Sequence, residues 1–376
     1  MINKIRLIQL TRKLIQINSE NPPGDESILA GFVRGYLQKL GLRVKVYEFQ
    51  NKRSNLLAYL ERPGNKRSLL ITPHLDTVCA GKNWKTGPFA AKIIGKRIYG
   101  LGATDCKGNL ACAIEVLNSL VEEKKYLDYD LILAATADEE SGSGLGLIPL
   151  LDKKILTPDA ALVLDADDFE IIVTQKGLIH LKVKIEGKRA HGAYPQLGVN
   201  AIDLALAVIR EIKEHKFTYT RNQYLKPPTV NVGTIKGGDK VNVVADWCEF
   251  ELDFRFLPGT KPAEILAALK GILKKRVKKY KIEIEGIQKT YSIAEKHPLV
   301  SGLKKAMRDF GIKAPLKGSE GATVITFFQD KNIPAIASGF GCAGCAHISD
   351  EYAEIGNLYK GAQVLERFLE NYKFQQ

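Results

Sequence analysis

Histidine and aspartate stand together where a strand-like segment of this sequence ends. His74 and Asp76 follow the apolar segment 69–72. Side chains two residues apart in an extended chain point to the same side, so Asp76 could hold the second ring nitrogen of a metal-bound His74. Taken alone, the pair is better explained as a hydrogen-bonded surface pair.

Further acids follow two later apolar segments in the same way. The acidic triplet 138–140 comes directly after segment 131–136, and Asp165 follows segment 160–164. Consecutive carboxylates beside a buried strand are electrostatically unfavourable unless a cation neutralises them. A plain acidic turn is the alternative interpretation of each segment alone.

A glycine-rich loop, residues 99–109, carries Asp105 just before a predicted helix. Alone, Asp105 would be a helix N-cap. The glycines and the Lys-Gly pair of the loop also resemble a phosphate-binding loop. Their spacing matches neither the dinucleotide fingerprint nor the P-loop, so nucleotide binding is disfavoured.

Together these residues indicate a metal site. A second histidine, His347, follows the apolar segment 333–338 near the C-terminus. Ligands in open α/β sheets usually bind beyond the carboxyl ends of the strands. Mixed nitrogen and oxygen ligands suit zinc, manganese or cobalt better than calcium or magnesium. A carboxylate shared by two ions about 3.5–4 Å apart would give a two-metal hydrolytic centre.

The elements that must position these residues alternate between helix and strand. Short apolar strands interleaved with helices predict a largely parallel α/β sheet with covered faces. The expected elements of this part are helices 4–17, 26–40 and 109–122 and strands 43–49, 56–61, 69–72, 131–136 and 160–165.

From Gly177 the predicted order becomes strand-helix-strand-strand-helix-strand, the order of a ferredoxin-like unit. The expected elements are strands 178–186, 229–236, 247–256 and 281–288 and helices 200–215 and 261–280, followed by helix 298–310 and strand 335–338. We therefore expect an α/β fold with a discontinuous, metal-binding catalytic domain, residues 1–176 and 288–376. A ferredoxin-like α+β domain, residues 177–287, is inserted in it.

Composition excludes several classes of protein. A chain of 376 residues is longer than a single hydrophobic core usually supports, which predicts two domains. Its content of 45% apolar and 26% charged residues is typical of globular proteins. Six cysteines are too few for a disulfide framework, and apolar runs stay shorter than a membrane span, so we expect a cytoplasmic protein without membrane association. The net charge is +13, but the densest basic run, 274–281, ends a predicted helix and lacks interleaved aromatic residues. We expect no nucleic-acid partner.

Five motifs recur in an order that resembles the co-catalytic zinc metallopeptidase family of acetylornithine deacetylase, succinyl-diaminopimelate desuccinylase, aminoacylase and glutamate carboxypeptidase. The resemblance covers nearly the whole chain. The motifs are His74-Leu-Asp76, Gly102-Ala-Thr-Asp105-Cys-Lys-Gly, Asp138-Glu139-Glu140, Lys188-Arg-Ala-His191-Gly and Ala346-His347-Ile-Ser-Asp-Glu351.

The resemblance implies two divalent metal ions per subunit, zinc in the first place and cobalt or manganese as alternatives. It implies that Glu139 is the general base and that Asp76 supports His74. The implied metal ligands are His74 and Asp165 for one ion, Glu140 and His347 for the other, and Asp105 as the bridge between them.

The resemblance also assigns roles to the inserted domain. His191 would reach the active site of a partner subunit in a homodimer and stabilise the developing oxyanion. The inserted domain would mediate that dimerisation and close as a lid. Asn242 and Arg255 match positions at which relatives contact the substrate.

Three departures from the family pattern bear on the substrate. The segment Lys317-Gly-Ser-Glu320-Gly-Ala-Thr323 lacks the aspartate and the carboxylate-binding arginine that deacylases commonly carry there, so Arg255 or Lys317 would have to substitute. Asp165 stands where dipeptidases and aminopeptidases often have Asp and deacylases usually have Glu. Cys342 and Cys345 replace a Gly-Pro-Gly turn and could be redox-active, bind metal or fill a tight loop.

The leading hypothesis is a two-metal amide hydrolase that acts on N-acyl amino acids or on small peptides. The alternative is a catalytically silent metal-binding scaffold of the same fold, and a nucleic-acid-associated protein comes last.

Overall fold

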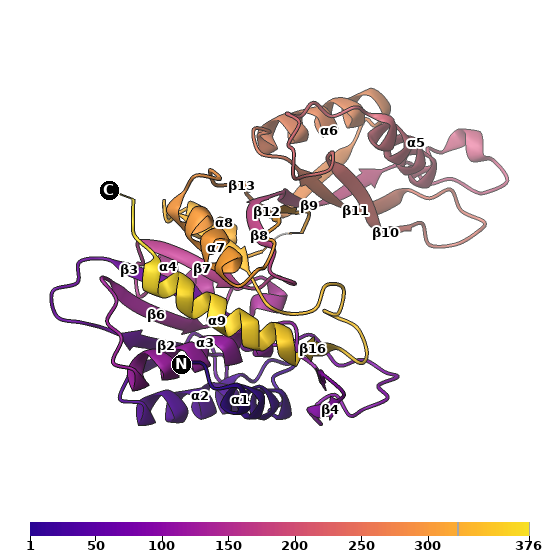
Figure 1. The fold of residues 1–376 in the computed structure, drawn as a ribbon. Coiled ribbons are helices and arrows are strands. Elements are labelled where there is room, and N and C mark those ends of the chain that lie inside the picture. The colour runs from indigo at the N-terminus through magenta and orange to yellow at the C-terminus, as the bar shows by residue number, and fades with distance from the viewer. Residues whose placement is uncertain (322, 376) are drawn as a thin grey trace. The chain divides into compact units, whose positions relative to one another are not determined.

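The computed structural model describes residues 1–321 and 323–375 (Figure 1). The chain forms two compact units. The first consists of Met1–Val173, Ile293–Lys317 and Phe327–Gln376, and the second of Thr174–Ser292 and Gly318–Thr326. In the described residues no helix is both long and apolar enough to cross a membrane.

The first unit is built on a mixed β-sheet. In spatial order the strands are β1 (Arg43–Glu48), β2 (Ser54–Leu60), β6 (Asp130–Ala135), β3 (Ser68–Thr72), β7 (Ala160–Leu164), β15 (Ala335–Ser338), β8 (Ile171–Gln175) and β13 (Tyr291–Ser292). A ninth strand, β14 (Leu316–Ser319), also pairs with β8. The central pairs β6–β3, β3–β7 and β7–β15 are parallel, whereas β1–β2, β2–β6, β15–β8 and β13–β8 are antiparallel. The prediction of a largely parallel sheet is therefore wrong outside the centre. A short hairpin loop joins β1 to β2, and such a loop can connect only antiparallel strands.

Helices cover the central strands, which explains their continuous apolar sequences. In β6 and β7 every residue except Asp130 is buried. The helices of this unit are α1 (Lys4–Gln16), α2 (Ser27–Lys39), α3 (Lys107–Glu122), α7 (Pro298–Asp309) and α9 (Ile355–Asn371). Helix α3 packs against α1 and α9, α7 packs against α9, and α2 packs against β1 and β2 (Figure 1).

Short elements that the sequence did not predict complete the chain. They are α4 (Leu147–Asp152), α8 (Ile325–Gln329), β4 (Lys92–Ile94), β5 (Arg97–Tyr99), β13 (Tyr291–Ser292), β14 (Leu316–Ser319), β16 (Tyr352–Glu354) and the 3₁₀ turns Glu139–Ser141 and Pro195–Leu197. Strands β16, β5 and β4 form a small separate sheet. Two of these elements, β5 and β16, lie beside loops that matter for the candidate site.

The second unit has the predicted ferredoxin-like order. Its elements are β9 (Gly177–Glu186), α5 (Ala201–Glu214), β10 (Thr229–Gly237), β11 (Trp247–Phe256), α6 (Pro262–Arg276) and β12 (Tyr280–Gln288). The antiparallel sheet runs β10-β11-β9-β12. Alternate residues of β11, among them Phe250 and Phe254, are buried with apolar residues of α5 and α6. The period of two puts one face of the sheet in the core.

Residues 318–326 belong to the second unit, although the predicted boundaries place them in the catalytic domain with the rest of 288–376. Hydrogen bonds explain this membership. The Gln175 side chain accepts from Thr323 N at 3.0 Å and from Thr323 Oγ1 at 2.7 Å. Lys176, which is buried, forms an ion pair of 2.6 Å with Glu320. Ala322 of this segment lies outside the described residues.

The packing of the second unit gives a first prediction. We expect Phe250→Ala to lower the free energy of unfolding of this unit by about 3–5 kcal/mol, because it leaves a cavity in the core. Urea denaturation followed by circular dichroism measures the change. The control is Ile235→Ala at a position that is 46% exposed, for which we expect less than about 0.5 kcal/mol. Equal effects of the two variants would contradict the assigned core.

Candidate metal and catalytic site

The sheet topology brings the predicted metal ligands to one edge. His74 follows β3, the triplet 138–140 follows β6, and Asp165 follows β7. These three strands are parallel neighbours, so their carboxyl ends lie side by side. Strand β15 runs parallel to β7, and the segment that follows it carries His347.

Two groups of potential ligands lie around Asp105. On one side, Nε2 of His74 lies 2.9 Å from Asp105 Oδ1 and 3.6 Å from Asp165 Oδ1. On the other, Nε2 of His347 lies 3.1 Å from Asp105 Oδ2 and 3.1 Å from Glu140 Oε2. The two carboxylate oxygens of Asp105 thus face two different histidines. This is the arrangement that a bridging ligand requires.

The Glu139 carboxylate lies in the first of these groups. One atom each of His74, Glu139 and Asp165 lies within 4.8 Å of the others. Glu139 begins the 3₁₀ turn after β6, and Asp138, in the left-handed conformation with φ 65°, precedes it. The tight turn separates the directions of Glu139 and Glu140, so that neighbouring acids belong to different groups.

Asp76 supports the site in a way that the sequence did not predict. The His74 ring is held through Nδ1 by the backbone carbonyl of Asp76 at 2.9 Å, while the Asp76 carboxylate is 3.6 Å away. That carboxylate accepts hydrogen bonds from Glu139 N and Glu140 N, both at 3.1 Å. It also accepts one from the Asn21 side chain at 2.9 Å. Asp76 therefore fixes the acidic turn as well as the histidine.

A buried ion-pair network also anchors the same turn. The Arg53 guanidinium donates to Asp138 at 2.9 Å and binds the Glu26 carboxylate through two of its nitrogens. All three side chains are buried. Arg53 and Glu26 were missed in the sequence, because nothing local marks partners that lie 27 and 85 residues apart. The third acid of the triplet, Asp138, is engaged by Arg53.

The electrostatics of the cluster favour positive charge beside its carboxylates. Burial, and then the charge of Asp165, raises the pKa of Glu139 well above its usual value. Hydrogen bonds to Asp105 and Glu140 raise the pKa of His347 to about 10. Burial alone would lower the pKa of His74, but hydrogen bonds to the Asp105 and Asp165 carboxylates raise it well above its usual value. Protons on the imidazoles thus balance the carboxylates, and divalent cations would do so at the same place.

The donor set fits zinc, cobalt or manganese, since it combines two imidazoles with carboxylates. The Cys106 thiol also lies beside His74 and Asp105. It accepts a hydrogen bond from His74 N at 3.1 Å, and burial raises its pKa to about 12. A thiol with so high a pKa stays protonated and is a poor ligand, so Cys106 is a packing residue.

The other three predicted site residues belong to the second unit. His191 is exposed, and its Nδ1 accepts from Ala193 N at 3.0 Å. Asn242 adjoins it, because its carbonyl accepts from the backbone N–H that follows His191. Arg255 binds Asp253 through two hydrogen bonds of 2.7 and 2.9 Å. Its guanidinium is therefore already paired with a carboxylate.

The two cysteines before His347 form a tight turn. Cys345 N donates to the Cys342 carbonyl at 3.0 Å, and Gly344 between them has φ 73°. Burial, and then the Cys342 thiol, raises the pKa of Cys345 to about 11. Within the described residues no histidine or carboxylate joins the pair to complete a metal-binding group. Of the three interpretations, a packed loop agrees best with these contacts.

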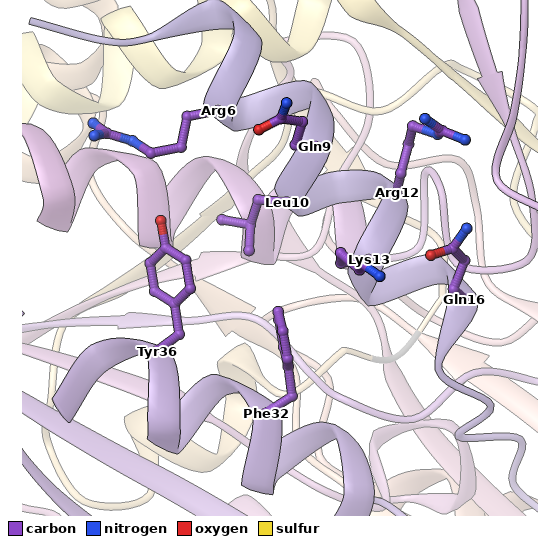
Figure 2. A pocket seen from close by; sticks show the side chains of 8 residues that line it. All are labelled: Arg6, Gln9, Leu10, Arg12, Lys13, Gln16, Phe32 and Tyr36. Carbon is purple, nitrogen blue, oxygen red and sulfur yellow. The ribbon is translucent and has the colours of Figure 1, made fainter. Parts of the chain in front are cut away.

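A cavity of about 620 Å³ lies away from these ligands, between α1 and α2 (Figure 2). The side chains that line it are Arg6, Gln9, Leu10, Arg12, Lys13, Gln16, Phe32 and Tyr36. None of these eight is a histidine or an acid. Arg6, moreover, is bound to Glu115 and Glu122. The cavity therefore contributes no metal ligand.

Known proteins resemble the chain over almost its full length. Residues 70–371 match the model of peptidase family M20/M25/M40. An acetylornithine deacetylase from Buchnera aphidicola is 30% identical, with 94% of this chain and 95% of the relative covered. A tripeptidase structure from Staphylococcus aureus is 26% identical, with a TM-score of 0.83 and 98% of both chains covered.

A dinuclear metal-binding peptidase from Bacillus subtilis has the same fold, with a TM-score of 0.75, 15% identity and coverage of 98% of this chain and 97% of the other. The resemblance drawn from the sequence motifs is thereby confirmed. The chain belongs to peptidase family M20/M25/M40 and is a metal-dependent hydrolase of amide or peptide bonds.

Proposed function

We propose that the protein hydrolyses small peptides or N-acyl amino acids with two divalent metal ions. His74 and Asp165 would hold one ion, Glu140 and His347 the other, and Asp105 both. The observation that carries this proposal is the position of Asp105, whose two oxygens lie 2.9 and 3.1 Å from two different histidines. The dinuclear metal site named for the Bacillus subtilis neighbour supports it.

The proposed metal is zinc, with cobalt or manganese as alternatives. When bound, such ions lower the pKa of a water molecule and polarise the substrate carbonyl. The backbone carbonyl of Asp76 keeps the His74 ring in place, with the proton on Nδ1 and Nε2 free to ligate.

Glu139 is the proposed general base. Its carboxylate lies with His74 and Asp165, and the Asp76 carboxylate holds its backbone N–H at 3.1 Å. A carboxylate fixed there takes a proton from the attacking water and passes it to the nitrogen of the leaving amine.

The second unit supplies the proposed contacts to the substrate. We assign His191 to the oxyanion in the site of a partner subunit, in a homodimer formed through this unit. Its imidazole is exposed, as a group that acts outside its own unit must be. Asn242 is proposed to bind substrate beside it. Arg255 would have to exchange its bonds to Asp253 for a substrate carboxylate.

Several contacts favour small peptides over N-acyl amino acids. In deacylases an arginine in the segment 317–323 binds the substrate carboxylate, but here Lys317 is paired with Glu170 at 2.9 Å. Lys176 is paired with Glu320. Neither cation is free to bind an α-carboxylate. A small peptide, the kind of substrate that the name of the tripeptidase relative indicates for that protein, is compatible with this arrangement.

The test is a hydrolysis panel of dipeptides, tripeptides, N-acetyl amino acids and N-succinyl amino acids, with the protein loaded with zinc, cobalt or manganese. We expect turnover of peptides. Turnover of the acyl amino acids alone would reverse the preference and point to Arg255. Silence across the panel in a metal-loaded protein would favour a catalytically silent scaffold. The Glu139→Gln variant serves as the blank.

A further inference from the structure

Glu351 is a buried acid whose carboxylate is bound entirely by backbone donors. Glu351 as a whole is only 1% exposed. Oε1 accepts hydrogen bonds from Thr104 N at 2.8 Å and Asp105 N at 3.0 Å, and Oε2 accepts one from Gly102 N at 2.9 Å. The three N–H groups belong to the loop that carries Asp105. One side chain thus fixes the backbone of that loop at three points.

The chemistry of this contact requires a carboxylate. An ionised carboxylate only accepts hydrogen bonds, and all three partners are donors. A glutamine would have to turn its NH₂ toward one of these N–H groups, which would leave buried donors facing each other. An aspartate keeps the charge but is shorter by one methylene, so it cannot span the same three donors.

The segment around Glu351 also ties the Asp105 loop to the His347 loop. Glu351 comes four residues after His347 and directly precedes β16. The Glu351 carbonyl accepts from Gly100 N at 2.9 Å, and the Tyr352 carbonyl accepts from Thr104 Oγ1 at 2.7 Å. Strand β16 then pairs with β5, which leads into the same loop. These contacts therefore hold together two loops that are far apart in the sequence.

We propose that Glu351 is a positioning residue that sets the Asp105 carboxylate between the two metal ions and in register with His347. It contacts no reacting atom and acts through the backbone of the Asp105 loop. This inference rests on the proposed function, because it takes Asp105 as the shared ligand.

The test compares Glu351→Gln with the wild-type protein by titrating the metal-free full chain with zinc and with cobalt. Calorimetry gives affinity and stoichiometry, and the cobalt absorption bands report ligand geometry. We expect about 10- to 100-fold weaker binding and altered bands for the variant, as for other residues that orient metal ligands. The control is Glu354→Gln, in β16 but 42% exposed and paired with Arg97, which should bind metal like the wild type.

Glu351→Asp is the second variant, in case the glutamine variant does not fold. We expect its affinity to fall between those of the wild type and Glu351→Gln. A folded variant of either kind with wild-type affinity and cobalt spectrum would overturn the inference, even if its melting temperature were lower. A wild-type protein that bound no metal would refute the proposed function and this role with it. Two ions in the wild type and weaker binding only in the Glu351 variants would support both.

Discussion

Glu139→Gln should lower kcat by about 10²- to 10⁴-fold while the protein still binds two metal ions. The loss is that expected when a general base is removed. The glutamine keeps the shape of the side chain, and the turn that carries it remains held by the Asp76 carboxylate. The measurement is steady-state hydrolysis of the best substrate of the panel, together with the metal content of the same preparation.

Glu140→Gln is the matched control, one residue along the same turn. Its carboxylate lies 3.1 Å from His347, so we expect this variant to lose metal as well as activity. Glu139→Ala should resemble Glu139→Gln in both respects. If Glu139→Gln lost metal, Glu139 would be a ligand and another group would have to be the base.

The gathering of the proposed ligands at one edge of the sheet could be predicted from the sequence, because it depends on strand ends. His74 and Asp165 directly follow short apolar segments, and those segments are β3 and β7. Parallel neighbours place their carboxyl ends at one edge of a sheet, so the apolar pattern alone brings these side chains together. The bounds of β11 and β15 were likewise predicted from alternation and from apolar content.

The residues that hold the loops carrying the proposed ligands could not be predicted, because each contact joins distant segments. Arg53 and Asp138 are 85 residues apart, and Glu351 and Asp105 are 246 apart. No local pattern in a single sequence encodes such pairs. Helix α9 is a different case, since Leu358, Leu365 and Phe368 already recur at helical spacing. That signal was present and was overlooked.

The direction of the edge strands and the boundary between the units could not be predicted from local sequence patterns either. Strand β1 runs antiparallel to β2, and β8 runs antiparallel to β15. The apolar content of a strand does not reveal in which direction it runs. Residues 318–326 join the second unit through polar bonds of Glu320 and Thr323. The sequence of a polar segment between two predicted elements does not indicate against which unit the segment packs.

The second large effect that we expect is the loss of the metal pair in Asp105→Asn. Asp105 is the only one of the proposed ligands that faces both histidines, at 2.9 and 3.1 Å. Asparagine offers one oxygen, and its NH₂ cannot bind a metal. We therefore expect fewer than two ions per chain and, since a metal ion contributes several kcal/mol to catalysis, a fall in kcat of about 10³-fold or more.

Metal analysis after gel filtration and the hydrolysis assay measure both effects of Asp105→Asn on one sample. Asp152→Asn is the control for a lost surface carboxylate, because Asp152 pairs with Lys331 and is exposed. This variant should keep two ions and full activity. Two ions and wild-type kcat in Asp105→Asn would show that the ions do not share this residue. One ion with full activity would show instead that a single metal suffices, and the proposed ligands of the other ion would then lose their part in the reaction.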